Sequence, residues 1–238
     1  MSKYTKKKGI HIKKIKKHKK KIYQISYKDQ SEALKKNIVI NYPFYIISII
    51  CIYLLSRKPS NKRSFINMLV SFIFIAFIGY IIHIASHHFI FTNIYNDYPV
   101  ICKNIPILDN CIRYLTWFLD FHHITHHNSD VNKEFKNQVL EAINNFVMQG
   151  AFIGFIYYMM DGRMFLFWGI LYASCHIINY TYLEPSVHRD HHIDIHSNYG
   201  MDIFDILMGT KYDWNDIENY NHYSINMIIL TIITYYIL

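Results

Sequence analysis

Apolar residues fall along this chain in long runs that polar stretches separate. The first run, Ile38–Leu55, contains Pro43, and the second, Phe65–Ile82, has only Asn67 and Ser71 as clear polar interruptions. A helix of 18 residues is about 27 Å long, which is close to the hydrocarbon thickness of a bilayer. Both runs therefore predict transmembrane helices, and the proline predicts a kink in the first.

Three more apolar runs follow in the second half of the chain. Asn145–Met160 and Met164–Leu183 are separated by Asp161-Gly162-Arg163, a sequence typical of a tight turn. Ser224–Leu238 is short, so it either crosses the membrane or lies along its interface. We therefore predict an all-α integral membrane protein with four or five transmembrane helices and a cytosolic histidine-rich cap.

The stretch between the second and third runs has a mixed character. Ile107–Leu119 has apolar residues at helical spacing, and Val131–Asn144 has the pattern of an amphipathic helix. We expect the latter to lie on the protein surface or at the membrane interface.

Charge is distributed unevenly over the 238 residues. The composition is 52% hydrophobic and only 18% charged, which is unusual for a soluble protein. Residues 1–36 hold 14 of the 25 Lys and Arg against Asp29 and Glu32, so their net charge is +12 and the other residues together carry −4. We interpret residues 1–36 as a basic, disordered cytosolic tail that orients the protein, residues 37–223 as the membrane-embedded catalytic domain, and residues 224–238 as the apolar C-terminal segment.

The basic tail also predicts the topology. Lys and Arg favour the cytosolic side, so the tail, the end of the second span and the later histidines would all face the cytosol. The loop of residues 56–64 disagrees, because it holds Arg57, Lys58, Lys62 and Arg63 on the opposite side. Either the larger tail dominates, or Ile38–Leu55 is a re-entrant hairpin kinked at Pro43.

Histidines carry the candidate chemistry, because 12 of the 15 lie between positions 83 and 196. His11 and His18 lie in the tail without partners at ligand spacing, and we read His196 and His222 as hydrogen-bonded or interfacial residues. The others form three groups and one single residue: His83, His87 and His88; His122, His123, His126 and His127; His188, His191 and His192; and His176.

Two of the groups contain the pattern H-x-x-H-H. On a helix, residues i, i+3 and i+4 lie on one face with Cβ atoms about 5–6 Å apart, so their imidazoles can converge on a metal ion. A single zinc ion is satisfied by four ligands, and nine or so histidines therefore indicate two metal ions. Uncoordinated imidazoles at membrane depth would be costly, which favours metal binding over a purely structural role.

The histidine pattern resembles the three histidine boxes of the fatty acid hydroxylase/sterol desaturase superfamily. The boxes are His83-x3-His87-His88, His123-x2-His126-His127 and His188-x2-His191-His192, followed by Asn198-Tyr199-Gly200 and then by Asp205, Gly209 and Thr210 in the family's closing pattern. His176 falls where related proteins carry an additional ligand. The resemblance covers residues 65–210, and the stretch between the first two boxes is longer than the family pattern.

The resemblance implies a ligand set. Nine metal ligands are expected: His83, His87, His123, His126, His127, His176, His188, His191 and His192. Further metal-binding or supporting positions are His88, His122, Asn179, Asp190 and Asp205. Carboxylates near the boxes in sequence, Asp120 and Asp194 among them, are candidates to hold the imidazole N–H groups.

The resemblance also implies an activity. It is that of a membrane-bound non-haem di-iron oxidoreductase in the endoplasmic reticulum or an equivalent internal membrane, with the boxes facing the cytosol. Two iron ions would use O2 to hydroxylate or desaturate a lipid, either a sterol or a fatty-acyl chain, and zinc could replace iron in the isolated protein. The chain lacks a His-Pro-Gly-Gly haem motif, so electrons are expected from a separate donor such as cytochrome b5 and its reductase. No nucleic acid partner is expected.

Two alternatives of other classes stay open. The chain could be a divalent-metal transporter that uses histidines as transit sites, or a catalytically inactive membrane protein that binds zinc. Transit sites need few ligands and often use carboxylates, and the closing pattern has no role in them. Iron content and oxygen-dependent product formation distinguish the three hypotheses.

Overall fold

The computed structural model describes residues 27–58, 64–97, 101–127, 134–149, 162–183 and 185–237. Within these ranges the regular elements are all helices and none is a strand, which agrees with the predicted all-α class. Residues 1–26, which hold most of the basic tail with His11 and His18, lie outside the described part.

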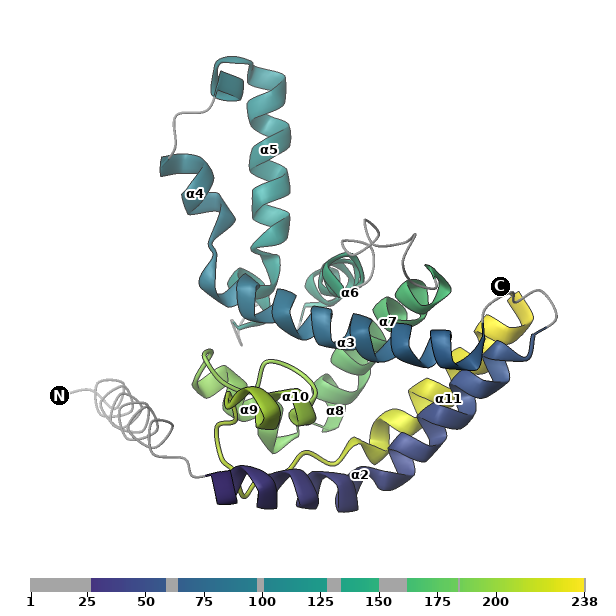
Figure 1. Cartoon of the computed structure of the whole chain (residues 1–238). Coiled ribbons are helices and arrows are strands. Elements are labelled where there is room, and N and C mark those ends of the chain that lie inside the picture. Colours follow the sequence, from purple (N-terminus) through teal and green to yellow (C-terminus); the bar gives the residue numbers. More distant parts are fainter. Residues whose placement is uncertain are drawn as a thin grey trace.

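The first described helix, α2 (Tyr27–Ser56), is continuous and contains Pro43. Its axis changes direction near the middle (Figure 1), as expected where a proline removes a backbone hydrogen bond. This segment is one bent helix, so the alternative of a re-entrant hairpin is wrong. The helix also begins inside the segment that was predicted to be a disordered tail. In this part of the helix Ala33 is buried, and Gln30 Nε2 donates to the Ile206 carbonyl at 2.7 Å.

Helix α3 (Phe65–His88) runs across the middle of the molecule (Figure 1). It and α2 are the two described helices that are long and apolar enough to cross a membrane. Only 39% of the most apolar window of α3 and 33% of that of α2 is buried, whereas the core helix of a soluble protein would be mostly covered. Side chains such as Ile66 and Ile73 are more than half exposed.

The other predicted spans have different outcomes. Most of Asn145–Met160 lies outside the described residues. The run Met164–Leu183 is helical but divided into α7 (Gly162–Ser174), the π-helix η4 (Cys175–Tyr180) and α8 (Thr181–Leu183). The final run forms α11 (Ser224–Ile237), which follows the short 3-10 helix η5 (Tyr220–Tyr223).

The hydrophobic core lies where α2, α3, α7 and α11 pack together. Its fully buried members come from all four helices and include Ile52, Met68, Ile75, Phe167 and Met227. Trp168 and Phe167 of α7 pack edge-on against Phe72 of α3. This core fixes the direction of α3, whose end carries His83 and His87, and of α7, which leads directly into η4 with His176.

Buried polar contacts attach α2 to the segment after the third histidine group. Asn41 donates from Nδ2 to the Glu218 carbonyl at 2.9 Å and accepts the Tyr220 N–H at 2.7 Å. In α10 (Asp202–Met208), Asp202 forms a fully buried ion pair with Lys211 and accepts from Asn37 at 3.2 Å. Asn41 therefore connects α2 to the segment that precedes α11.

Two helices between the first and second histidine groups form an arm that projects from the rest of the molecule (Figure 1). They are α4 (Phe91–Asp97) and α5 (Pro106–Leu119), joined through the 3-10 helix η1 (Ile101–Asn104). Helix α5 agrees closely with the predicted Ile107–Leu119. The remaining elements near the histidines are the π-helix η2 (His122–His126), α6 (Phe135–Gln149) and α9 (Ser186–Ile193).

Candidate metal centre

The histidines that the sequence spreads over more than 100 residues meet in one buried region. They come from the end of α3, from η2, from η4 and from α9. Two of these four elements are π-helical, with wider turns than an α-helix, and such turns are frequent at functional sites. The sequence did not predict either π-helical element.

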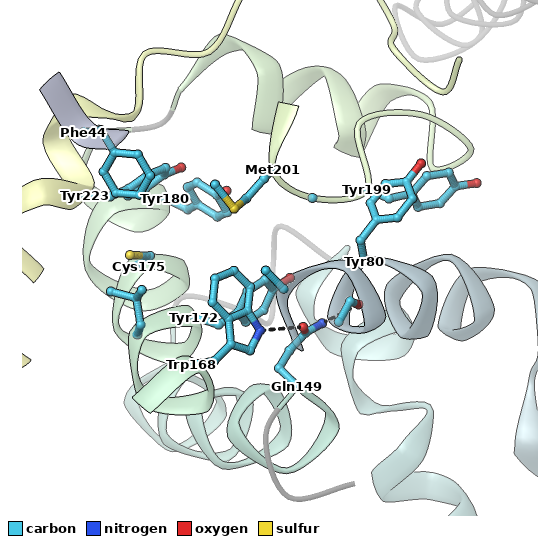
Figure 2. Close-up of a pocket in the computed structure, with 14 residues that line it drawn as sticks. Phe44, Tyr80, Gln149, Trp168, Tyr172, Cys175, Tyr180, Tyr199, Met201 and Tyr223 are labelled. Carbon is cyan, nitrogen blue, oxygen red and sulfur yellow. Dashed lines mark hydrogen bonds between the residues drawn. The ribbon is translucent and has the colours of Figure 1, made fainter. Parts of the chain in front are cut away.

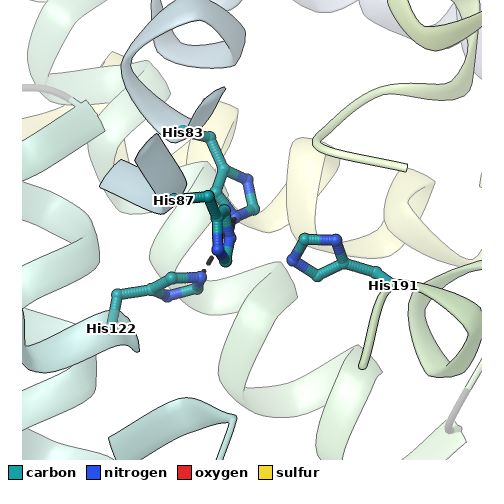
Figure 3. A group of neighbouring side chains, drawn as sticks. All are labelled: His83, His87, His122 and His191. Atoms are coloured by element: carbon teal, nitrogen blue, oxygen red, sulfur yellow. Dashed lines mark hydrogen bonds between the residues drawn. The ribbon is translucent and has the colours of Figure 1, made fainter. Parts of the chain in front are cut away.

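One group of four imidazoles consists of His83, His87, His122 and His191, all buried. Figure 3 shows their rings directed toward a common centre, from α3 for the first two and from separate elements for the others. Each residue offers one ring nitrogen within 4.8 Å of those of the others. His83 Nε2 lies 3.0 Å from both His87 Nε2 and His122 Nε2.

These separations fit a shared metal ion. Two nitrogens that each lie about 2.1 Å from one ion, at right angles, are about 3.0 Å apart. One N–H···N hydrogen bond would explain a single such contact. However, a neutral imidazole has only one N–H, and the same nitrogen of His83 makes two contacts at this distance.

A second group consists of His126, His188 and His192. His188 Nε2 lies 3.2 Å from His126 Nε2 and 3.1 Å from His192 Nε2, so the same geometric argument applies. Tyr180 stacks on the His188 ring, with centroids 3.9 Å apart and an angle of 20° between the planes. This stacking fixes the orientation of the His188 imidazole.

Glu141 of α6 connects the second group to His176. Its Oε1 lies 2.5 Å from His126 Nδ1 and 3.0 Å from His176 Nδ1, and all three side chains are buried. A carboxylate at Nδ1 directs the opposite nitrogen, Nε2, toward a metal ion and makes the imidazole more basic. The group His122, His126, Glu141 and His176 is also compact enough to hold an ion, so Glu141 is either a ligand or the residue that orients two ligands.

Buried nitrogen atoms without partners point to the same conclusion. Neither ring nitrogen of His127 has a hydrogen-bond partner, and the same holds for Nε2 of His176 and His191. The His127 ring lies between the groups, 4.8 Å from that of His87 and 4.7 Å from that of His192. Each unpaired buried polar atom costs about 1–3 kcal/mol, and a metal ion would remove this cost. The buried histidine groups can therefore hold metal.

Burial also keeps the imidazoles of His188, His191 and His192 neutral, which is the form that binds metal. Burial lowers the pKa of His191 to about 3, although its bond to the Ser197 carbonyl acts in the opposite direction. Burial, followed by the neighbouring His126 ring, lowers the pKa of His192 to about 3 and that of His188 well below its usual value. The three rings are consequently neutral at physiological pH, as metal coordination requires.

The loop after the third group holds its histidines in place. His191 Nδ1 donates to the Ser197 carbonyl at 2.6 Å. This bond leaves Nε2 of His191 free to face His83, His87 and His122. Asn198 has φ of 51°, which asparagine tolerates. Its side chain donates to the Val187 carbonyl and accepts from Tyr212 N–H. Asn198 thereby joins α9 to the chain that follows α10.

Asp205 organises the next two residues of this loop. It accepts hydrogen bonds from the backbone N–H of Tyr199 at 2.9 Å and of Gly200 at 3.2 Å, and from the Thr210 hydroxyl at 2.6 Å. The Tyr199 ring in turn lies 5.7 Å from that of His87. A Cβ at Gly200 would lie 3.2 Å from the Tyr80 ring, so glycine permits the close approach. Asp205 thus holds Tyr199 in place, and within the described part of the chain it belongs to none of the compact groups.

Other predicted positions lie at the edge of the centre or away from it. His123 belongs to neither tight group, and its ring lies 5.7 Å from that of His87. His88 is exposed and bonds to the Ile84 carbonyl. Asn179 donates to the His222 carbonyl at 3.0 Å. Asp190 is absent from the compact groups of the described residues.

The remaining carboxylates and single histidines have local roles. Asp120 accepts from the N–H groups of Phe91 and Thr92 at the start of α4, both at 2.8 Å. Asp194 accepts from the His196 N–H at 3.2 Å, and the His196 ring lies 5.5 Å from that of His88. The His222 ring lies 4.0 Å from that of Tyr223.

An apolar cavity lies close to the histidines. Figure 2 shows aromatic side chains around it, with Trp168 and Gln149 joined by a hydrogen bond on one side. Three of the lining residues also touch candidate ligands. Tyr172 and Tyr199 contact His83, and Tyr180 stacks on His188. The cavity thus lies beside both histidine groups.

The structure adds participants that sequence reasoning missed or ranked low. His122 joins the first group, although it precedes the H-x-x-H-H pattern. Glu141 was not predicted at all, because its segment was read as a surface helix. Its buried neighbours Asn144, Asn145 and Met148 lie at helical spacing from it, and this face was the available signal.

Comparison of the chain with models of known protein families, with curated proteins and with solved structures finds no match.

Proposed function

We propose that this chain is a membrane-bound non-haem di-iron oxidoreductase that hydroxylates or desaturates a lipid. The observation that carries the proposal is the position of two compact groups of imidazoles beside one apolar cavity. The two groups match two metal ions, and the cavity matches a substrate without charge. The resemblance of the histidine boxes to the fatty acid hydroxylase/sterol desaturase superfamily supports the choice of iron and of a lipid.

The chain's own residues prepare the site. His83, His87, His122 and His191 would hold one ion, and His126, His176, His188 and His192 the other, with His127 between them. The Ser197 carbonyl orients the His191 ring by accepting its Nδ1–H, and the Glu141 carboxylate faces Nδ1 of both His126 and His176. An iron pair bound there would supply the reduction of O2 and the oxidation of an unactivated C–H bond.

The cavity supplies position and dryness. Its aromatic walls place a hydrocarbon segment at a fixed distance from the histidines, and positioning of this kind lowers the activation barrier. Hydroxylation inserts one oxygen atom into the C–H bond and reduces the other to water, and it consumes two electrons and two protons. Desaturation reduces both oxygen atoms to water with the same external electrons. A separate donor such as cytochrome b5 with its reductase would provide them.

The membrane placement is part of the same proposal. Helices α2 and α3 are apolar enough to span a bilayer, and the Lys-rich tail favours a cytosolic N-terminus. The histidines at the end of α3 would then lie at the cytosolic rim, within reach of a soluble or membrane-bound electron donor. We place the protein in the endoplasmic reticulum or an equivalent internal membrane.

The test begins with protein purified in detergent or nanodiscs. Iron and zinc per chain are measured by mass spectrometry, and oxygen consumption is measured with a reductant, the donor system and extracted membrane lipids. We expect about two iron ions per chain and oxygen-dependent formation of hydroxylated or unsaturated lipid. Comparative lipidomics of cells with and without the protein then identifies the substrate.

Two outcomes would overturn the proposal. Zinc alone, with no oxygen consumption after reconstitution with iron, would indicate a zinc-binding protein without turnover. Metal flux into sealed vesicles that contain the protein, with no lipid product, would indicate a transporter.

A further inference from the structure

In the arm formed by α4 and α5, the polar side of α5 faces α4. The Tyr95 hydroxyl donates to Asp109 Oδ1 at 2.7 Å, and Arg113 donates from Nε to Asp109 Oδ2 at 2.8 Å. Arg113 Nη1 also donates to Asn96 Oδ1 at 3.2 Å, and its guanidinium lies over the Tyr95 ring. Helix α4 therefore covers the side of α5 that carries Asp109 and Arg113.

The opposite side of α5 is apolar and uncovered. Ile107, Cys111, Tyr114, Leu115 and Phe118 are spaced at i, i+4, i+7, i+8 and i+11, which places them on one helical face. Ile107 is 80% exposed, Tyr114 74% and Leu115 55%. In a soluble protein such a face would be turned inward, because each Å² of apolar surface left in water costs about 25 cal/mol.

The direction of the arm indicates what covers this face. In Figure 1 the axis of α5 stands across that of α3, at the end of α3 that carries His87 and His88. If α3 crosses a bilayer, α5 lies parallel to the membrane plane at the level where α3 leaves it. Helix α5 is also on the side of the arm nearer the body of α3, and α4 is on the far side (Figure 1). The uncovered face is thus turned toward the hydrocarbon.

The composition of the arm agrees with a lipid surface. Tyr114 and Trp117 are exposed aromatic residues of α5, and Tyr and Trp concentrate at membrane interfaces. Residues 91–119 contain two acidic residues, Asp97 and Asp109, and two basic ones, Lys103 and Arg113, so their net charge is zero. The arm is therefore not held at a membrane by attraction to anionic head groups. Its affinity for a membrane would come from the apolar face of α5.

We propose that α5 is an interfacial helix that lies flat in the membrane surface, with Ile107, Tyr114 and Leu115 among the lipid acyl chains and α4 on the aqueous side. The inference rests on the membrane placement of α3 within the proposed function, but it is independent of the metal and of turnover. It gives the extended stretch between the first two histidine boxes a role, because η2 directly follows the arm. An anchored arm would hold the ligands of η2 at a fixed depth.

Cys111 provides a natural position for a probe, because its side chain is exposed on the apolar face. The experiment uses the full chain in vesicles of zwitterionic lipid, with Cys51, Cys102 and Cys175 replaced by alanine and a fluorophore on Cys111. Quenching is measured with lipids that carry a nitroxide either near the head-group end or near the methyl end of the acyl chain. Two matched probes complete the set, on Asn93→Cys at the exposed outer side of α4 and on Ile73→Cys within α3.

We expect the Cys111 probe to be quenched several-fold more by the shallow nitroxide than by the deep one. The Asn93→Cys probe should respond instead to a water-soluble quencher, and the Ile73→Cys probe to the deep nitroxide. Adding Leu115→Asp should reduce the quenching at Cys111, because a charge on this face opposes insertion.

Each contrary result has a distinct meaning. If the Ile73→Cys probe is quenched by lipid and the Cys111 probe is not, the arm is not interfacial although α3 spans the membrane. If Cys111 avoids both lipid and water quenchers and forms disulfides between chains, a second copy covers the face and the inference is overturned. If neither Cys111 nor Ile73→Cys is quenched by lipid, α3 does not span the membrane, and the inference fails together with the membrane placement.

Discussion

Glu141 holds the imidazole of His126, with Oε1 only 2.5 Å from Nδ1 and both side chains buried. A buried carboxylate is costly unless it is paired, and Glu141 is paired twice, since His176 Nδ1 lies 3.0 Å from the same oxygen. The neighbouring imidazoles outweigh the opposing effect of burial and hold the pKa of Glu141 below its usual value. The carboxylate is thus ionised, and it lies close to Nδ1 of both imidazoles at once.

The substitution Glu141→Gln tests this role. The amide has the same shape, but it carries no charge and its oxygen is a weaker acceptor, so one of the two rings loses its orientation. We expect metal affinity to fall about 10–100-fold, measured by competition with a chelator. Glu134→Gln is the matched control, because Glu134 is exposed. Unchanged affinity in Glu141→Gln would show that this carboxylate does not orient the ligands.

Removal of a central ligand should abolish turnover without preventing insertion. His191 is fully buried, and its Nε2 has no hydrogen-bond partner, so His191→Ala leaves one ion with an incomplete set of ligands. We expect no lipid product above background in His191→Ala or in His126→Ala, with normal amounts of protein in the membrane fraction. His88→Ala, at the exposed end of α3, should keep its activity. Full turnover of either core variant would remove that histidine from the mechanism.

The position of the cavity predicts that a substitution in its wall reduces substrate binding and leaves the metal content unchanged. Ala76 is buried and lines the cavity, so the ring of Ala76→Phe would occupy the space of the lipid, at a cost to stability of about 1–3 kcal/mol. We expect product formation to fall at least about tenfold, a loss of 1.4 kcal/mol or more in transition-state binding, with unchanged metal content. Val70→Phe, on the exposed side of the same helix, is the control. Equal turnover of the two variants would place the substrate elsewhere.

The buried carboxyl group of Glu218 should make the free energy of unfolding depend on pH. Burial raises the pKa of Glu218 to about 8, although the hydrogen bond from the Tyr223 hydroxyl opposes the shift. The folded protein therefore holds this proton more tightly than the unfolded chain, in which the group titrates near 4.5. The contribution to stability is complete below pH 4.5 and is lost as the pH rises through 8, by at most about 1.4 kcal/mol per pH unit.

The substitution Glu218→Gln isolates this effect, because the neutral amide does not titrate. We expect the variant to lose less free energy of unfolding than the wild type between pH 5 and pH 9, as measured by denaturant titration in micelles. Asp216→Asn, on a partly exposed residue of the same loop, should follow the wild type. Parallel curves for Glu218→Gln and the wild type would contradict the assignment of the proton to Glu218.

The sequence predicted the helices and most of the histidines for definite physical reasons. Apolar runs long enough to span a bilayer identified α3 and the larger part of α2, and period-3.6 spacing identified α5. Repeated H-x-x-H-H spacing indicated that imidazoles converge. These signals are local, so a single stretch of chain is enough to reveal them.

What the sequence did not reveal depends on contacts between distant segments. Glu141 is distinguished from a surface glutamate only by the imidazoles that reach it from η2 and η4. His122 lies in the π-helical element η2, and its contact with His83 depends on how that element meets α3. The start of α2 at Tyr27 depends on contacts with α10, such as Gln30 with the Ile206 carbonyl, which no local pattern contains.

The π-helical turn η2 places His122 among the imidazoles of one group and His126 in the other, within a single five-residue element. If each group holds one ion, as proposed, the two ions would share one piece of backbone. The first ion to bind would then order the turn and so lower the entropic cost of binding the second. Partial loading should give a mixture of empty and doubly loaded chains rather than singly loaded ones, and native mass spectrometry would resolve the two cases.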